Sequence, residues 1–349
     1  MIFASDNWAG AHPAIVQALA DHAGGHAHAY GDSDLDHAVR RRFCEIFDKD
    51  VAVFFVSTGT AANALSLASA SRPGGVAFCH AEAHLVEDEA GATEYLTGGT
   101  RLARVGGPLG RIDPQALEAA IRRYPPEFLH AGRPVAVSVT QASEIGTVYA
   151  PDELDAITAV AKRHGLAVHM DGARFTNALV SLDLSPAEMT WKRGVDLLSF
   201  GGTKNGCWCA EAVVLFDPAQ AGEFAFLHKR AAQLLSKSRF VAAQFQAYFD
   251  DDLWLDNARH ANAMAARLAE CVKRSGSTRL AWEPQANEVF VIMANATAKQ
   301  LTDAGVAFYD WNAPEGFQGI MATDERICRF VASFATTAEE IDRFAGLIA

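Results

Sequence analysis

Small and hydroxyl-bearing residues follow an apolar run near the start of the chain, in the segment VSTGTAANA (56–64). A helical pattern continues from this segment, so Thr58, Gly59 and Thr60 fall at the N-terminus of a helix. Backbone N–H groups are free at such a terminus and can bind an anion such as a phosphate group. Ordinary helix capping favours the same residue types, so both interpretations stay open here. The segment is neither a Walker P-loop nor a G-x-G-x-x-G dinucleotide motif.

An acidic residue and a lysine each follow an apolar run that is typical of a buried strand. Asp171 ends the run LAVHMD (166–171), and Lys204 lies in the glycine-rich loop GGTKNG (201–206). Because ligands bind at the carboxyl ends of strands in open α/β sheets, both side chains are candidate site residues. A buried carboxylate needs a cationic partner, which is either a ligand or Arg174 in a structural pair. A partly desolvated lysine amine can form a Schiff base, whereas most lysines are simply solvated.

An anion site, a buried acid and a loop lysine are together what pyridoxal phosphate (PLP) requires. They hold the phosphate, pair with the pyridine nitrogen and attach the aldehyde. The chain also resembles the low-specificity L-threonine aldolases from about residue 3 to its end. The resemblance rests on the segments FASDN (3–7), AYGD (29–32), STGTAAN (57–63), AHLVEDEAGA (83–92), HMDGARFTNA (169–178), FGGTKNG (200–206) and QANEVFVIM (285–293). It implies the β-eliminating lyase group, the aspartate-aminotransferase type I fold and PLP as the cofactor.

The resemblance implies a role for each residue around the cofactor. Lys204 would form the Schiff base, and Asp171 would keep the pyridine nitrogen protonated so that the ring can accept electrons. Gly59 and Thr60 would hold the phosphate group. His84 would stack on the face of the ring, close to the hydroxyl group of the substrate.

The resemblance also implies a set of residues that bind the substrate and join subunits. Ser5, Arg174 and Arg329 would surround the carboxylate and phenolate groups of substrate and cofactor, with Arg329 as the main carboxylate ligand. Arg239 would reach the cofactor phosphate of a neighbouring subunit, and Tyr30 would cross the same interface. These two residues imply a homo-oligomer, expected to be a dimer of dimers.

The implied reaction is retro-aldol cleavage of an L-β-hydroxy-α-amino acid, such as L-threonine, L-allo-threonine or phenylserine, to glycine and an aldehyde. A base must remove the β-hydroxyl proton, and histidine titrates near the working pH. His84, or a water molecule that it holds, is the preferred base, and His130 is the second candidate. Glu144 lies in TQASEIG (140–146), which departs from the family pattern, and receives no role. Three alternatives stay open: a related PLP enzyme (a transaldolase, an α-methylserine-type aldolase or a β-elimination lyase), a non-catalytic PLP module, and a cofactor-free α/β binding protein.

Two features have a purely structural interpretation that competes with the functional one. Arg329 could pair with an acid of its own segment, Asp324 or Glu325, instead of a substrate carboxylate. His26 and His28 lie two positions apart in a glycine-rich stretch. A metal site needs more converging ligands than two, so we expect no metal ion.

Apolar runs alternate with helical patterns over the first two thirds of the chain. The strand-like runs are 51–56, 75–79, 101–105, 134–140, 166–171, 195–200 and 212–216, with helical patterns such as 114–124 and 151–165 between them. Nearly continuous apolar strands indicate a mostly parallel sheet between helices. Beyond about residue 245 come a long helix (253–273), short strand-like runs that begin with AWEP (281–284), and a final helix with a capping box of Thr337 and Glu340. We expect a large α/β domain over residues 1–248 and a small C-terminal α+β domain over 249–349.

Length, charge and cysteine content exclude several classes of protein. The chain has 349 residues, with 30 Lys and Arg against 42 Asp and Glu, so its net charge of −12 argues against nucleic-acid and polybasic membrane-surface binding. The sequence has no apolar run that could span a bilayer and no signal-peptide pattern at MIFASDNWAG. Six cysteines do not make a disulfide scaffold, and Cys207 and Cys209 lack the spacing of a zinc site. We therefore expect a soluble cytoplasmic protein.

Overall fold

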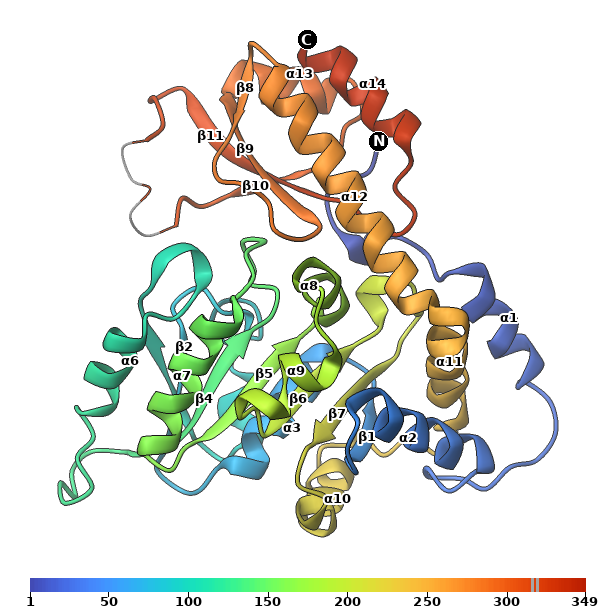
Figure 1. Cartoon of the computed structure of the whole chain (residues 1–349), viewed down its shortest axis with the longest axis vertical. Helices are drawn as coiled ribbons and strands as arrows, with labels where there is room; N and C mark the ends of the chain where they lie inside the picture. The colour runs from blue at the N-terminus through green and yellow to red at the C-terminus, as the bar shows by residue number, and fades with distance from the viewer. Residues whose placement is uncertain (315–316, 318–319) are drawn as a thin grey trace.

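A seven-stranded sheet forms the centre of the larger part of the molecule (Figure 1). The computed structural model describes residues 1–314, 317 and 320–349. The strands are β1 (Ala52–Val56), β2 (Gly75–His80), β3 (Arg101–Val105), β4 (Arg133–Thr140), β5 (Ala167–Gly172), β6 (Leu197–Gly201) and β7 (Glu211–Leu215), in the order β1-β7-β6-β5-β4-β2-β3. All pair in parallel except β7, which is antiparallel to both β1 and β6. The expected mostly parallel sheet is therefore confirmed.

Helices cover both faces of this sheet, which explains why its strands are apolar throughout. In β6, Leu197 packs in the core beneath α3 and α10, whereas Leu198 joins the core on the opposite face, with Phe43 of α2 and Leu154 of α7. The helices of this part are α1 (Pro13–Asp21), α2 (Asp34–Phe47), α3 (Gly59–Ala70), α4 (His84–Glu87), α5 (Ala92–Leu96), α6 (Pro114–Ile121), α7 (Pro151–Arg163), α8 (Phe175–Leu182), α9 (Pro186–Met189), α10 (Ala221–Arg230) and α11 (Arg239–Phe249).

A smaller antiparallel sheet carries the C-terminal third of the chain. Its strands, in the order β10-β11-β9-β8, are β8 (Thr278–Leu280), β9 (Glu288–Ala294), β10 (Tyr309–Trp311) and β11 (Glu325–Val331). In β9, Val289 and Val291 face a core formed with α12 (Leu253–Arg274), α13 (Asn295–Asp303) and α14 (Ala338–Ile348). The alternate residue Phe290 faces the larger part, where it packs with Ile145. Both faces of this sheet are therefore buried, and one of them docks on the larger part.

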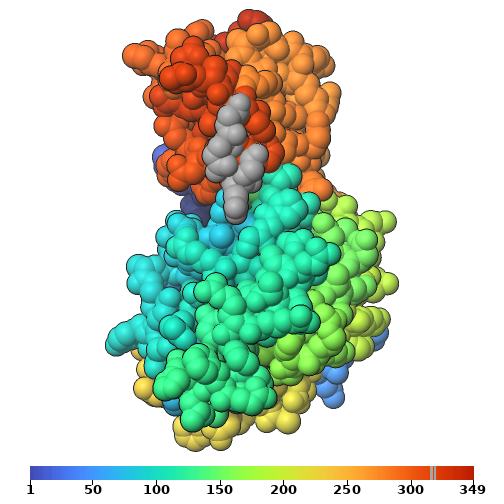
Figure 2. Space-filling model, turned by 90° about the vertical axis from the view of Figure 1, so that its left-hand side faces the viewer, coloured from blue at the N-terminus to red at the C-terminus, as the bar shows by residue number. Residues whose placement is uncertain are grey.

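The long helix α12 joins the two cores. Its Trp254 packs in the core of the larger part, whereas Leu268 belongs to the core of the small sheet. In Figure 2 the residues that follow this helix form a lobe above the rest of the molecule. Phe3 also packs in the core of the small sheet, and Ile2 makes a bridge to Ala307. The expected division after residue 248 stays a prediction, and the first three residues pack with the lobe rather than with the larger part.

One expected strand is not formed. The run AWEP (281–284) lies outside the strands, and β8 ends just before it at Leu280. Pro284 has no N–H to donate to a sheet ladder, and Trp282 instead stacks 4.7 Å from Phe290 and donates its indole N–H to the Ile145 carbonyl.

The final helix begins as expected. The hydroxyl of Thr337 accepts from the Glu340 backbone and the Glu340 carboxylate accepts from the Thr337 backbone, which completes the capping box. Among the described residues, no helix combines the length and the apolar character that a membrane crossing requires.

Candidate active site

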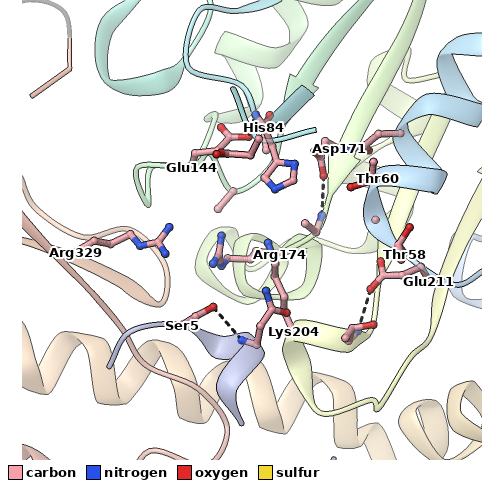
Figure 3. A pocket seen from close by; sticks show the side chains of 18 of the residues that line it. Ser5, Thr58, Thr60, His84, Glu144, Asp171, Arg174, Lys204, Glu211 and Arg329 are labelled. Atoms are coloured by element: carbon pink, nitrogen blue, oxygen red, sulfur yellow. Dashed lines mark hydrogen bonds between the residues drawn. The ribbon is translucent and has the colours of Figure 1, made fainter. Parts of the chain in front are cut away.

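A pocket of about 510 Å³ lies at the edge of the large sheet where the parallel strands end, and residues of the small lobe close its far side (Figure 3). The pocket gathers most of the residues that the sequence singled out: Ser5, Gly59, Thr60, His84, Asp171, Arg174, Lys204 and Arg329. They come from segments that are far apart in sequence. Because the strands are parallel, their carboxyl ends meet at one edge and bring these segments together.

One end of the pocket is the N-terminus of α3. The hydroxyl of Thr58 caps this helix by accepting from the Ala61 N–H at 3.1 Å. Helix geometry leaves the N–H groups of Gly59 and Thr60 without a partner inside the helix, so both can bind an anion. The N–H and hydroxyl of Ser57 both donate to the Gln233 side chain, so Ser57 is already engaged.

Asp171 lies near the end of β5 with only 3 % of its surface exposed. One carboxylate oxygen accepts from the Asn63 side chain at 2.8 Å, and the other accepts from the Ala173 N–H at 3.0 Å. The structural alternative, a pair between Asp171 and Arg174, is not formed: Arg174 binds Asp6 instead. Asp171 makes no ion pair with any residue that the structure describes, so its charge faces the pocket uncompensated.

Lys204 sits in a short 3₁₀ turn, Thr203–Asn205, directly after β6. Two hydrogen bonds hold the turn in place, because the Asn205 amide donates to the Tyr248 hydroxyl at 2.6 Å and to the Trp254 carbonyl at 2.8 Å. The two glycines that precede this turn have no space for a side chain. A Cβ at Gly201 would lie 2.8 Å from the carbonyl oxygen of Ala173. Lys204 forms no ion pair within the described part of the chain, which leaves its amine available.

Two arginines face the pocket from opposite lobes. Arg174 is buried and binds both carboxylate oxygens of Asp6, at 2.7 and 3.0 Å. Burial opposes the ionisation of Asp6, but Arg174, Lys204 and Asn287 together outweigh it and hold the pKa of that carboxyl below its ordinary value. Arg329 extends from β11 and lies over the ring of Trp311 at 4.4 Å. Glu288 stands between the arginines, 3.4 Å from Arg174 and 3.6 Å from Arg329, and burial raises the pKa of its carboxyl.

The structural interpretation of Arg329 from the sequence is wrong. Glu325 pairs with Arg279 of β8, the strand on the other side of β9, and not with Arg329. Among the described residues, the polar contacts of Arg329 are the longer one to Glu288 and a 3.4 Å hydrogen bond to the Ala4 carbonyl, and its buried Nε has no hydrogen-bond partner among them. A guanidinium with unused donors at the rim of a pocket is suited to bind a carboxylate.

His84 is held by two carboxyl groups. Its Nδ1 lies 2.9 Å from Glu89, whose side chain is fully buried, and its backbone N–H donates to Glu144 at 2.7 Å. Asn63 donates to both Glu89 and Asp171, so a continuous chain of hydrogen bonds runs from His84 to Asp171. The hydrogen bond to Glu89 raises the pKa of His84 against the opposing effect of burial. With Nδ1 engaged, Nε2 is the nitrogen left to act in the pocket.

Two buried glutamates of the pocket were not assigned from the sequence. Burial raises the pKa of both Glu144 and Glu211 to about 7, and the nearby Asp171 adds to the rise. Glu144 was noted in TQASEIG without a role, and Glu211 begins the apolar run of β7. The signal for Glu211 is an acidic residue that opens an otherwise apolar strand. Trp311 was also missed, because a lone tryptophan in a short strand gives no such signal.

The structure does not bring His130 to the pocket. It precedes β4, whereas the pocket lies beyond the carboxyl end of that strand, so His130 stands at the opposite edge of the sheet. Its ring is exposed and packs 5.4 Å from Phe128. The assignment of His130 as a base is therefore corrected.

Tyr30 and Arg239 also lie outside the pocket of their own chain. Tyr30 is 55 % exposed, and its N–H donates to the Ser236 carbonyl, which places it beside the start of α11, where Arg239 lies. Their predicted contribution to a neighbouring subunit stays a prediction. His26 and His28 are exposed, and among the described residues no three His, Cys, Asp or Glu side chains gather as a metal site.

Comparisons with known proteins agree with this site. The family model for β-eliminating lyases matches residues 3–296. A Pseudomonas aeruginosa protein named low-specificity L-threonine aldolase is 39 % identical over 344 residues, which cover 98 % of this chain and 95 % of that protein. A protein of the same name from a Pseudomonas strain is 38 % identical over 328 residues, 94 % of each chain.

Solved structures of other proteins have the same fold as this chain. The threonine aldolase of Leishmania major superposes with a TM-score of 0.91 at 28 % identity, over 99 % of this chain and 98 % of that one. A Sphingomonas wittichii serine palmitoyltransferase, at 18 % identity, has a TM-score of 0.71 over 100 % of this chain and 86 % of its own. The fold is the type I fold of PLP-dependent enzymes, as expected from the sequence.

Proposed function

The chain belongs to the β-eliminating lyase family, and on this basis we propose that its pocket binds PLP and cleaves L-threonine and related L-β-hydroxy-α-amino acids to glycine and an aldehyde. The enzyme is an aldehyde-lyase of the low-specificity L-threonine aldolase type. One observation carries the proposal. A lysine and a buried carboxylate that form no ion pair with the described residues share one pocket with a helix N-terminus and with an arginine whose Nε has no hydrogen-bond partner among those residues.

The side chains present fit PLP. Lys204 would hold the aldehyde carbon, Asp171 the pyridine nitrogen, and the N–H groups of Gly59 and Thr60 the phosphate. His84 would lie against the ring. When bound, PLP supplies an electron sink for the bond that breaks at the substrate Cα.

The protein's own residues position the substrate and move one proton. Arg329 binds the substrate carboxylate through its free donors, with Ser5 and Arg174 beside it. His84 accepts the β-hydroxyl proton at Nε2, directly or through a water molecule, because Glu89 occupies Nδ1. Loss of this proton turns the hydroxyl into the carbonyl of the departing aldehyde as the Cα–Cβ bond breaks. A proton delivered to Cα then completes glycine.

The remaining parts of the proposal concern the whole protein. We place it in the cytoplasm, as a homo-oligomer in which Tyr30 and Arg239 complete the site of a neighbouring subunit. Residues 1–248 would form the PLP-binding domain, and residues 249–349 the small domain that carries Arg329. Support comes from the exposed position of Tyr30 outside its own pocket, and from α12, which joins the two cores.

The proposal is tested by analysing the products of the PLP-loaded protein. L-Threonine, L-allo-threonine, L-phenylserine and L-serine are supplied in turn, and glycine, aldehyde, ammonia and 2-oxo acid are quantified. We expect glycine and aldehyde in equal amounts from the first three substrates. Lys204→Ala should lack this activity, and Lys299→Ala, an exposed lysine of α13 outside the pocket, serves as the matched control. Ammonia and a 2-oxo acid without glycine would instead indicate a β-elimination lyase.

A further inference from the structure

A second carboxyl group lies at the anion-binding end of the pocket. Glu211 is the first residue of β7 and is only 5 % exposed, yet its side chain lines the pocket. One oxygen accepts from the Thr203 N–H at 3.2 Å. The other lies 3.9 Å from the position that a Cβ on Gly59 would occupy, so the carboxyl stands directly beside the N-terminus of α3 (Figure 3).

The surroundings of Glu211 disfavour the ionised form of its carboxyl. Glu211 forms no ion pair with any described residue, and burial is the largest effect that raises its pKa, to about 7. A phosphate group held by Gly59 and Thr60 would bring further negative charge close to it. Like charges that lie close together inside a protein repel each other, so an ionised Glu211 would oppose binding of the phosphate.

The groups that face Glu211 do not compensate a negative charge on its carboxylate. Hydrogen bonds from the side chain and the backbone of Thr203 lower the pKa of Glu211 without outweighing burial, and Lys204 and Asp171 act on it with opposite sign. The other titratable groups beside it are the thiols of Cys207 and Cys209 and the phenol of Tyr248. Burial raises the pKa of all three neutral groups above their ordinary values, so they stay uncharged near neutral pH. Glu211 itself is therefore the group on this side of the pocket that gains or loses a proton around pH 7.

We propose that Glu211 acts as a neutral carboxylic acid that donates a hydrogen bond to the phosphate of the cofactor, so that its ionisation weakens phosphate binding. The proposal rests on the proposed function, since it takes PLP as the ligand. A protonated carboxyl can accept from the Thr203 N–H and donate through its other oxygen, whereas the carboxylate can only accept. Glu211 thus supplies a donor that the helix N-terminus lacks, and it links cofactor retention to pH.

Pyridoxamine 5′-phosphate and pyridoxamine separate this effect from the chemistry of Lys204. Neither ligand has an aldehyde, so neither forms a bond to the lysine, and only the first carries a phosphate. Dissociation constants are measured from pH 6 to 9 on the full-length, cofactor-free protein, by quenching of tryptophan fluorescence. The variants are Glu211→Gln and the matched control Glu144→Gln, which alters the other buried glutamate of the pocket with a raised pKa.

For the wild type, affinity for pyridoxamine 5′-phosphate should fall close to tenfold for each pH unit above the pKa of Glu211. Glu211→Gln keeps both an acceptor and a donor, so its affinity should match the wild type at pH 6 and stay level up to pH 9. Glu144→Gln should retain the slope of the wild type. For pyridoxamine, the wild type and Glu211→Gln should give the same profile.

Two results would overturn the proposal. Equal pH profiles of wild type and Glu211→Gln for the phosphorylated ligand would reduce Glu211 to a structural partner of Thr203. A pH effect of the same size with pyridoxamine would remove the phosphate from the explanation. If Glu211→Gln does not fold, Glu211→Ala replaces it and should bind the phosphorylated ligand weakly and independently of pH. Failure of every variant to bind either ligand would instead contradict the proposed cofactor site as a whole.

Discussion

The buried carboxyl of Glu89 fixes which nitrogen of His84 faces the pocket, and it raises the pKa of that histidine. Replacing Glu89 by Gln should therefore lower the pKa of His84 towards its ordinary value and loosen the ring. We expect kcat/KM for L-threonine to fall about tenfold or more, with the acidic limb of its pH profile moving to lower pH. Kinetics from pH 5 to 9 measure both effects.

A control for this variant is available two residues earlier, at the end of α4. Glu87→Gln changes an exposed glutamate that pairs with Arg104, and it should leave the profile as in the wild type. An unchanged profile in Glu89→Gln would show that Glu89 only supports the loop and does not act through His84.

Asp171 should matter for turnover much more than for folding. In Asp171→Asn the one remaining side-chain oxygen can still accept from the Ala173 N–H. The atom that faces Asn63 becomes an amide donor, and the charge that would pair with the pyridine nitrogen is lost. We expect the loaded variant to keep the cofactor and lose about 100-fold or more in kcat. Cofactor content from the absorbance spectrum and turnover are measured on the same sample. Full turnover with bound cofactor would make Asp171 a structural residue.

The raised pKa of Glu144 predicts a pH-dependent stability of the cofactor-free protein. Its folded value of about 7 lies above the ordinary 4.5, so the folded state holds more protons between these values. The contribution of Glu144 to the free energy of unfolding is therefore greatest below pH 4.5, and this contribution is lost as the pH rises through 7. Glu144→Gln should therefore melt a few degrees higher than the wild type at pH 8 and gain nothing at pH 4.5. Equal melting differences at both pH values would contradict the shift.

The sequence alone predicted which residues after the apolar strands lie in the pocket, because parallel strands bring their carboxyl ends together at one edge of the sheet. Lys204, Asp171 and the start of α3 are the clearest cases. The assignment of His130 was wrong although a signal was present, since His130 precedes the apolar run 134–140 and so belongs to the other edge. The role of Glu89 could not be predicted, because its burial depends on distant parts of the chain, whereas Glu211 carried a signal that was missed, an acid at the start of an apolar strand.

Strand β11 sets the position of Arg329. Its register pairs Arg329 with Phe290 of β9 and Tyr309 of β10, which turns the guanidinium over the ring of Trp311 towards the pocket. Lysine has no planar fork for a carboxylate and stacks less well on an aromatic ring. Arg329→Lys should therefore raise KM for L-threonine and glycine by about 30-fold or more, while cofactor binding is unchanged.

The same strand offers the matched control. Arg326→Lys alters an exposed arginine that pairs with Asp310, outside the pocket. It should leave KM as in the wild type. An unchanged KM in Arg329→Lys as well would move the carboxylate site to Arg174 and Ser5.

Apolar periodicity located the strands of the large sheet to within one or two residues. It could not show that β7 runs antiparallel to its neighbours, because a strand buried on both faces is apolar in either direction. This direction has a consequence for the site: an antiparallel β7 begins at the edge where the others end, which brings Glu211 into the pocket.

At the scale of the whole molecule, the prediction is that subunits share their sites. If Arg239 acts on a neighbouring pocket, mixing inactive Lys204→Ala subunits with inactive Arg239→Ala subunits should restore activity, because each hybrid dimer contains one intact site. About a quarter of the wild-type activity is expected after random exchange. If Arg239 acted within its own chain, every hybrid would contain two defective sites. No recovery in a mixture shown to have exchanged subunits would contradict the shared site.

The arrangement of the two lobes suggests that substrate binding moves them relative to each other. Arg329 belongs to the small lobe, whereas Lys204 and Asp171 belong to the large sheet, and α12 joins the two cores. A substrate held by both sides would draw the lobes together and exclude water from the pocket. The position of the first three residues in the small lobe could not be predicted from sequence order.

The central claim, that this pocket holds the cofactor through Lys204, is tested most directly by peptide mapping. The protein is loaded with PLP, reduced with borohydride, digested and analysed by mass spectrometry. We expect one pyridoxyl-modified peptide, which contains Lys204 between β6 and β7. A modification confined to any other lysine, or none in a protein that cleaves L-threonine, would contradict the assignment of this pocket as the active site.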